Sequence, residues 1–292
     1  SSLVTNPFNM LTALELLGAE NYEIDSVTAD AIKADAPLLR EADKHELSRR
    51  FTRILLTRNI SGVMARFPEV FSAIEPELLK AQRYKERYYD STLWEHISKS
   101  VEFAPPQADI RYAMLFHNVG IPDCRCRDSH GNTFFYGHGE YGRITAANFF
   151  EKYRVELKLR SDTDMLIESH DISITEDRTA VKRLLCEYSH EELKKLIKLR
   201  IADDMAKPTV HEGVIAMYRR TLTMLEDIIA SGECYSISQL AIKENDLITH
   251  RLVANKAQAR AVIESLYEAV LTEPSLNVAP ILLDMVRKSV RR

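Results

Sequence analysis

Glycine and proline are scarce in this chain of 292 residues, with nine and ten copies respectively. Both residue types interrupt regular helices. Their scarcity, together with long stretches rich in Leu, Ala, Glu, Lys and Arg, therefore predicts a mostly helical protein. The sequence also has no run of 18 apolar residues, so we expect no membrane-spanning helix and no membrane partner.

Cysteine is scarce as well, with Cys124, Cys126, Cys186 and Cys234 the only four. So few cysteines in a chain of this length are typical of reduced thiols rather than of a disulfide framework. The first residues also lack the basic and long apolar regions of a signal peptide. We therefore expect a cytoplasmic protein. The spacing Cys124-Arg125-Cys126 is too short for a CxxC zinc knuckle, and a structural role is the simpler interpretation.

No excess of one charge is present, because 39 basic residues face 43 acidic ones and leave a net charge of −4. This balance gives no general argument for nucleic-acid binding. A local basic face remains open: the expected helix over residues 44–58 carries Arg49, Arg50 and Arg53 opposite its apolar side. A solvated face is the simpler interpretation, and contact with RNA phosphates is the alternative.

The hydrophobic periodicity predicts an all-α fold with one small exception. A β-hairpin or a looped excursion is expected across residues 124–136, where Gly131-Asn132 separates two short stretches that run from polar to aromatic. Gly62 should interrupt the helical pattern. Helices are expected at 7–20, 44–58, as a pair within 63–82, and at 91–103, 107–118, 138–157, 162–169, 189–206, 211–231, 236–248, 255–272 and 278–291.

One apolar run ends in polar residues that need partners. Tyr112-Ala113-Met114-Leu115-Phe116 leads into His117-Asn118, so a buried helix should deliver these two side chains to the interior. Burying such groups without partners is costly. Partners are available elsewhere in the chain: His96, His138, His170, Asp171, Asp203 and Asp204. Histidines and carboxylates from separate helices are a common way to build a metal site.

The order of these residues resembles a known family. The segments Trp94-Glu95-His96, His117-Asn118-Val119-Gly120 and Phe135-Tyr136-Gly137-His138-Gly139-Glu140 are similar to HD-domain metallophosphohydrolases. More closely, they resemble the HD and body region of bacterial CCA-adding enzymes, which are tRNA nucleotidyltransferases. The similarity continues through Glu168-Ser169-His170-Asp171, Arg200-Ile201-Ala202-Asp203 and the segment 240–247.

This resemblance implies a multi-helix HD-type core flanked by a helical neck and tail. The implied division is a neck-like region at 1–88, the metal core at 89–210 and a helical body and tail at 211–292. No Gly-Ser followed by Asp-x-Asp occurs near the start. We therefore expect the catalytic head of the family to be missing, and nucleotidyl transfer with it.

The resemblance also implies the ligands of one or two divalent metals: His96, His117, Asn118, His138, His170 and Asp203. Asp203 is preferred to Asp204 because it follows the alanine of the similar segment. Neighbouring residues of a helix point about 100° apart, so only one of the two faces the site. Imidazole and carboxylate ligands leave Mn, Ni, Fe, Zn and Mg all open as the metal.

Three positions depart from the family pattern. Asn118 stands where the family usually has Asp, Ile121 where Lys is frequent, and Phe134 where His is frequent. An amide oxygen can contact a metal but carries no charge and cannot bridge two cations as a carboxylate does. The sequence does not separate a natural Asn118 from an inactivating substitution.

Two functions follow as alternatives. The first is a metal-dependent phosphohydrolase or phosphodiesterase acting on a nucleotide, a cyclic phosphate or an RNA-end phosphoester, with Asn118, Arg125 and Arg127 at the reacting phosphate. We expect the loop that carries the two arginines to lie over the site. The second is a catalytically silent HD-fold module that binds tRNA, another RNA or a protein partner. The first is preferred, with Asn118 as a reason for inactivity. The oligomeric state stays open.

Overall fold

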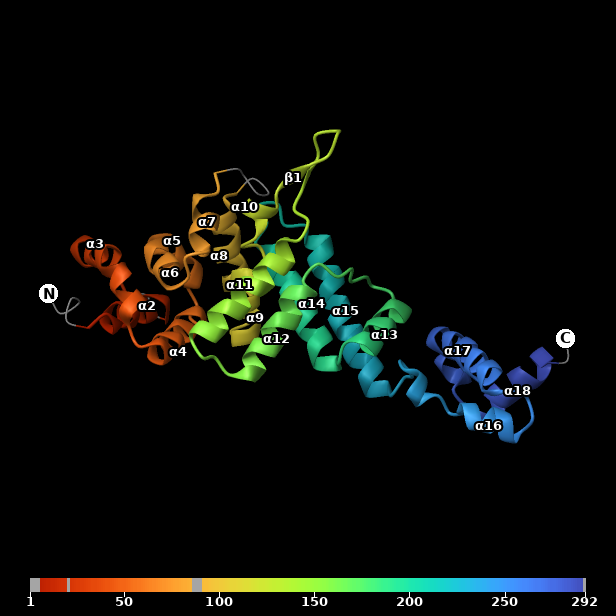
Figure 1. The fold of residues 1–292 in the computed structure, drawn as a ribbon. Helices are drawn as coiled ribbons and strands as arrows, with labels where there is room; N and C mark the ends of the chain where they lie inside the picture. Colours follow the sequence, from red (N-terminus) through yellow and green to blue (C-terminus); the bar gives the residue numbers. More distant parts are fainter. Residues whose placement is uncertain (1–5, 20–21, 86–90, 291–292) are drawn as a thin grey trace. The chain divides into compact units, whose positions relative to one another are not determined.

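A computed structural model describes residues 6–19, 22–85 and 91–290 of the chain. Residues 1–5, part of the stretch inspected for a signal peptide, lie outside the described residues. The expected all-α fold is confirmed, because the described elements are helices apart from one two-stranded sheet (Figure 1). Among these helices none is both long enough and apolar enough to cross a bilayer.

The chain forms two compact units. Unit 1 comprises Ser1–Ile172 and Lys198–Ile215, and unit 2 comprises Ser173–Ile197 and Ala216–Arg292. Two helices contribute to both units: α14 (His190–Met205) and α15 (Glu212–Ser231). The neck, core and tail boundaries implied by the family resemblance stay a prediction.

Unit 1 contains the helices that position the predicted site. They are α2 (Phe8–Ala19), α3 (Ser26–Asp35), the 3₁₀ helix η1 (Ala36–Glu41), α4 (Lys44–Leu55), α5 (Ile60–Arg66), α6 (Pro68–Ile74), α7 (Leu78–Arg83), α8 (Leu93–Phe103), α9 (Ala108–Phe116), α10 (Ile121–Cys124), α11 (His138–Lys152) and α12 (Leu157–Glu168).

Helix α9 lies at the centre of unit 1, where it contacts α4, α8, α11 and α12. All of its residues from Asp109 to Phe116 are buried. The Tyr112 and Phe116 rings stack at 6.5 Å between centroids, and Phe149 of α11 packs against both. The buried guanidinium of Arg111 donates to the carbonyls of Leu55 and Thr57, which joins α9 to the end of α4. This apolar surround holds the C-terminal end of α9 in place.

Close packing between α11 and the end of α9 depends on glycine. A Cβ atom on Gly142 would lie 2.3 Å from the Phe116 carbonyl oxygen, and one on Gly120 would lie 2.6 Å from the Tyr141 Cβ. A small residue one turn after His138, at Gly142, therefore lets α11 approach the end of α9.

The predicted hairpin is present within residues 124–136. Strands β1 (Cys126–Arg127) and β2 (Thr133–Phe134) pair antiparallel, with Cys126 opposite Phe134 and Arg127 opposite Thr133. Gly131 in the connecting turn has a φ of 85°, a conformation that glycine adopts at no steric cost. The hairpin projects from the helices around it (Figure 1).

Unit 2 is a separate helical assembly. Besides its shares of α14 and α15 it contains α13 (Arg178–Glu187), α16 (Glu244–Thr249), α17 (Lys256–Thr272), α18 (Ala279–Val290) and the 3₁₀ helices η2 (Ile237–Gln239) and η3 (Pro274–Leu276). One apolar cluster joins α16, α17 and α18 through Leu247, Ile263, Val270 and Leu282. The fully buried Lys182 of α13 pairs with Glu233 at 2.5 Å and donates to the Leu271 carbonyl.

The helix boundaries differ from the predicted ones at a few points. Helix α12 begins at Leu157 rather than near 162, because α11 already ends at Lys152. Gly62 lies inside α5 rather than breaking the pattern. No helix was predicted at α13, which has a short, charge-rich sequence. Its N-cap is Asp177, whose side chain accepts a hydrogen bond from the Ala180 amide.

We expect Gly142→Ala to destabilise unit 1 by about 1–3 kcal/mol, because the new methyl group would overlap a backbone carbonyl that cannot move aside. Chemical denaturation measures this change in the free energy of unfolding. The matched control is Gly213→Ala in α15, where a Cβ meets nothing within 4 Å and should be neutral or stabilise by up to about 1 kcal/mol. Equal effects of the two substitutions would contradict the packing argument.

Candidate metal centre

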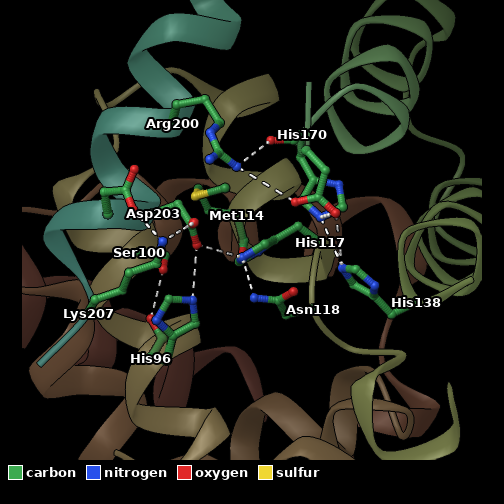
Figure 2. Close-up of polar contacts among 12 residues, drawn as sticks. His96, Ser100, Met114, His117, Asn118, His138, His170, Arg200, Asp203 and Lys207 are labelled. Atoms are coloured by element: carbon green, nitrogen blue, oxygen red, sulfur yellow. Dashed lines mark hydrogen bonds and ion pairs between the residues drawn. The ribbon is translucent and has the colours of Figure 1, made fainter. Parts of the chain in front are cut away.

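Two histidines and an aspartate from three helices form a first group, His96, His117 and Asp203. His96 lies on α8, whose start is fixed by a capping box between Thr92 and Glu95, and His117 follows the last residue of α9. Asp203 comes from the part of α14 that belongs to unit 1. Its Oδ1 atom lies 3.1 Å from Nε2 of His96 and 3.2 Å from Nε2 of His117 (Figure 2).

The second group consists of His138, His170 and Asp171. His138 is the first residue of α11, and His170 and Asp171 follow the end of α12. The two Nε2 atoms lie 3.1 Å apart. Oδ2 of Asp171 lies 3.3 Å from Nε2 of His170 and 3.7 Å from Nε2 of His138. In each of the two groups, the three ligand atoms lie within 4.8 Å of one another.

The two groups are neighbours that differ in exposure. The rings of His117 and His170 lie 5.5 Å apart at 74°, one from each group. In the first group, both histidines are buried and the Asp203 side chain is 13% exposed. In the second group, the Asp171 side chain is 65% exposed. Solvent and solutes therefore reach the second group directly and the first group much less.

Three of the four histidines have the same orientation. Nδ1 of His117 lies 2.9 Å from the Met114 carbonyl oxygen, Nδ1 of His138 lies 2.7 Å from that of Phe135, and Nδ1 of His170 lies 2.6 Å from that of Ile167. A carbonyl only accepts, so each Nδ1 carries the proton and donates. Each Nε2 then points into the site with a lone pair when the imidazole is neutral, which is how metal-binding histidines are oriented.

This orientation has a direct consequence in the second group. With both Nδ1 atoms protonated, two neutral imidazoles would direct lone pairs at each other across 3.1 Å. A proton or a cation between the two nitrogens removes that repulsion. The carboxylate of Asp171, within 4 Å of both nitrogens, favours the positive charge.

Asn118 contacts the first group in a way that an aspartate could not. Its Nδ2 amide lies 2.6 Å from Nε2 of His117 and donates to the lone pair of that nitrogen (Figure 2). Rotation of the amide by 180° about the Cβ–Cγ bond would present Oδ1 instead. The amide thus either satisfies His117 without a cation or offers one neutral oxygen ligand.

Burial shapes the protonation of the site. Burial lowers the pKa of His96, and burial together with the charge of His117 lowers the pKa of His170 to about 4. Both therefore stay neutral at pH 7. Burial alone would raise the pKa of Asp203, but the adjacent His117 and His96 imidazoles outweigh burial and hold that pKa well below its usual range. The carboxylate is thus available as an anionic ligand.

The structure brings together the six ligands implied by the resemblance as two clusters, with His96, His117, Asn118 and Asp203 in one and His138 and His170 in the other. Asp204 turns instead to Lys207, as the 100° rule requires. Two basic residues were missed: Arg200, which donates to the His170 carbonyl at 3.1 Å, and Lys207, 3.7 Å from Oδ2 of Asp203. The spacing of Arg200 and Lys207 around Asp203 was the available signal.

Arg125 and Arg127 belong to the hairpin. Arg125 is the half-buried residue that ends α10, and Arg127 is exposed on β1. Phe135, at the other end of the hairpin, joins it to the site through its carbonyl contact with His138. A phosphate contact by the two arginines, and a position of their loop over the site, stay predictions.

Comparison with known proteins shows the fold. No protein-family model matches the sequence, and no curated protein matches it either. Among solved structures, the chain is similar to the CCA-adding enzyme of Bacillus stearothermophilus, determined in complex with CTP, with a TM-score of 0.58 and 13% sequence identity. The alignment covers 99% of this chain but 63% of that enzyme. The two proteins share a helical fold over that region.

We expect His117 and His170 to carry their protons on Nδ1 at pH 7.5, because both Nδ1 atoms face carbonyl oxygens. Long-range ¹H–¹⁵N NMR correlations should show a protonated Nδ1 and an unprotonated Nε2 in both rings. The exposed His130 of the hairpin turn, whose Nδ1 faces the Ser129 hydroxyl rather than a carbonyl, is the internal control and should not be restricted to this tautomer. Protonated Nε2 atoms on both rings would contradict the orientation.

Proposed function

We propose that the two groups bind divalent cations and that the protein is a metal-dependent phosphohydrolase or phosphodiesterase. The observation that carries this proposal is the pair of Nε2 atoms of His138 and His170, 3.1 Å apart with both Nδ1 atoms committed to carbonyls. Two imidazoles and one carboxylate per group form a donor set that fits a divalent transition metal and leaves further coordination positions for water or substrate.

A divalent cation in such a site lowers the pKa of a bound water and stabilises charge on phosphate oxygens. The residues of the chain contribute the rest. His96, His117 and Asp203 provide a buried, anionic set of ligands, and Asn118 adds either an oxygen ligand or a donor. His138, His170 and Asp171 lie where a phosphoester from solvent reaches them. Arg200, within 3.7 Å of Asp171, brings positive charge to that side.

The substrate class proposed is a nucleotide, a cyclic phosphate or an RNA-end phosphoester, bound with help from Arg125 and Arg127. Support comes from the fold shared with an enzyme solved in complex with CTP and from the HD-like order of the histidines. The proposed metal is one of Mn, Ni, Fe, Zn or Mg, and the proposed location is the cytoplasm.

The second candidate is a silent HD-fold module that binds RNA or a protein. The contact between the Asn118 amide and His117 favours this alternative, because an amide that donates to Nε2 occupies the lone pair a metal would need. This objection applies to the first group only. The second group contains no residue that satisfies its two facing nitrogens in the same way, so the hydrolase remains the preferred function.

Elemental analysis of protein purified without added metal or chelator tests cation binding. We expect one or two equivalents of a transition metal. His117→Ala should lower the content through the first group and His138→Ala through the second. His130→Ala, on the exposed hairpin turn, is the matched control and should retain the full content. A protein that stays metal-free after dialysis against manganese or nickel would refute the enzyme proposal.

We expect Asn118→Asp to increase hydrolysis of a phosphodiester such as bis-p-nitrophenyl phosphate by about tenfold or more, which equals about 1.4 kcal/mol in the barrier. The reason is that a carboxylate adds charge and a bridging oxygen to the first group. The hydrolysis rate of Asn118→Asp is compared with that of Asn118→Ala at saturating manganese, because alanine adds neither a charge nor an oxygen ligand. An unchanged rate in a variant that does bind metal would favour the silent module.

A further inference from the structure

Both aspartates of the candidate centre have a basic partner from the α14 segment. Arg200 lies on α14, and its Nη1 is 3.7 Å from Oδ1 of Asp171. Lys207 lies two residues beyond the end of α14, and its Nζ is 3.7 Å from Oδ2 of Asp203. Figure 2 shows Arg200 beside His170 and Lys207 beside Asp203. Each group therefore has a cationic side chain beside its aspartate in addition to its two histidines.

The Lys207 contact is the more consequential of the two, because its surroundings are the less exposed. Lys207 and Asp204 form an ion pair. The Lys207 side chain is 19% exposed, and those of Asp203 and Asp204 are each 13% exposed. Asp203 directs one oxygen to the histidines and the other to the Lys207 ammonium. Desolvated charges interact more strongly than charges in water. Lys207 thus brings positive charge to two neighbouring carboxylates, in direct contact with Asp204 and 3.7 Å from Asp203.

A divalent cation at His96, His117 and Asp203 would compete with that ammonium. The cation would share the Asp203 carboxylate with Lys207, and the positive charge of Lys207 would repel the cation at short range. We propose that Lys207 sets the cation affinity of the first group: it offsets part of the negative charge of Asp203 and Asp204 in the cation-free protein and weakens cation binding there. This inference rests on the proposed function, because it presumes that the first group binds a cation.

The proposal distinguishes Lys207 from a residue that merely supports the fold. Without Lys207, two poorly solvated carboxylates, Asp203 and Asp204, lose their ammonium partner, so the cation-free protein should become less stable. The same loss of positive charge should make the group a better site for a cation. Stability without metal and affinity for metal therefore change in opposite directions.

The test is a titration of manganese into Lys207→Met by calorimetry, in a His138→Ala background that disables the second group. We expect binding to the first group at least about tenfold tighter than in His138→Ala alone. Two controls accompany it. Lys207→Arg keeps the charge and should keep the weaker affinity. Lys198→Met removes a lysine from another face of α14 and should leave the affinity unchanged.

Thermal unfolding provides the second measurement. In the presence of EDTA, Lys207→Met should unfold at a lower temperature than its parent, and manganese should raise its unfolding temperature more than that of the parent. Unchanged or weaker manganese binding in Lys207→Met, beside a parent that binds, would overturn the inference and leave the proposed function intact. If neither parent nor wild type binds any cation, the proposed function fails and the inference fails with it.

Discussion

The contact of α11 with the end of α9 is the constraint on which the candidate centre depends. Gly142 lets the helix backbone approach the carbonyl of Phe116, one residue before His117. Gly139, in the first turn of α11, lies against the His170 ring, where a Cβ would lie 3.0 Å from a ring carbon. Because α11 begins at His138, this approach brings a histidine of one group next to the end of the helix that carries a histidine of the other. A larger residue at Gly142 would move α11 away from the end of α9, and one at Gly139 would press against the His170 ring.

Backbone carbonyls also fix the orientation of three histidine rings. His117, His138 and His170 each lie three residues after the carbonyl that accepts from Nδ1. The carbonyls of Met114 and Ile167 belong to the last turns of α9 and α12, where carbonyls lack partners within the helix, and that of Phe135 precedes α11. At the two helix ends, the same hydrogen bonds satisfy a carbonyl and orient an imidazole. Since these bonds are local, the orientation of each ring is secured before any ligand arrives.

Much of this could be predicted from sequence because the relevant signals are local. The apolar run before His117 predicted a buried helix end, and Gly131-Asn132 predicted the hairpin. Grouping His96 with His117 and Asp203 came from a resemblance to a family. Periodicity alone says nothing about which helices meet. The i, i+4 spacing of Lys207 from Asp203 was visible in the sequence, but it indicates a role only once Asp203 is known to lie beside the histidines. The short, charge-rich sequence of α13 gives no such local signal, and its Lys182 is buried against Glu233, which is distant in sequence.

The unequal exposure of the two groups has a consequence for exchange with solvent. Asp171 is open to water, so a cation held there would equilibrate with the medium quickly and follow its free concentration. The first group is enclosed by α8, α9 and the α14 segment, and a cation would enter or leave only when these elements open locally. Cation occupancy of the first group would then be set largely when the chain folds. Cation occupancy of the second group would follow the free cation concentration in the solvent. Two chemically similar ligand sets would thus exchange their cations with solvent at very different rates.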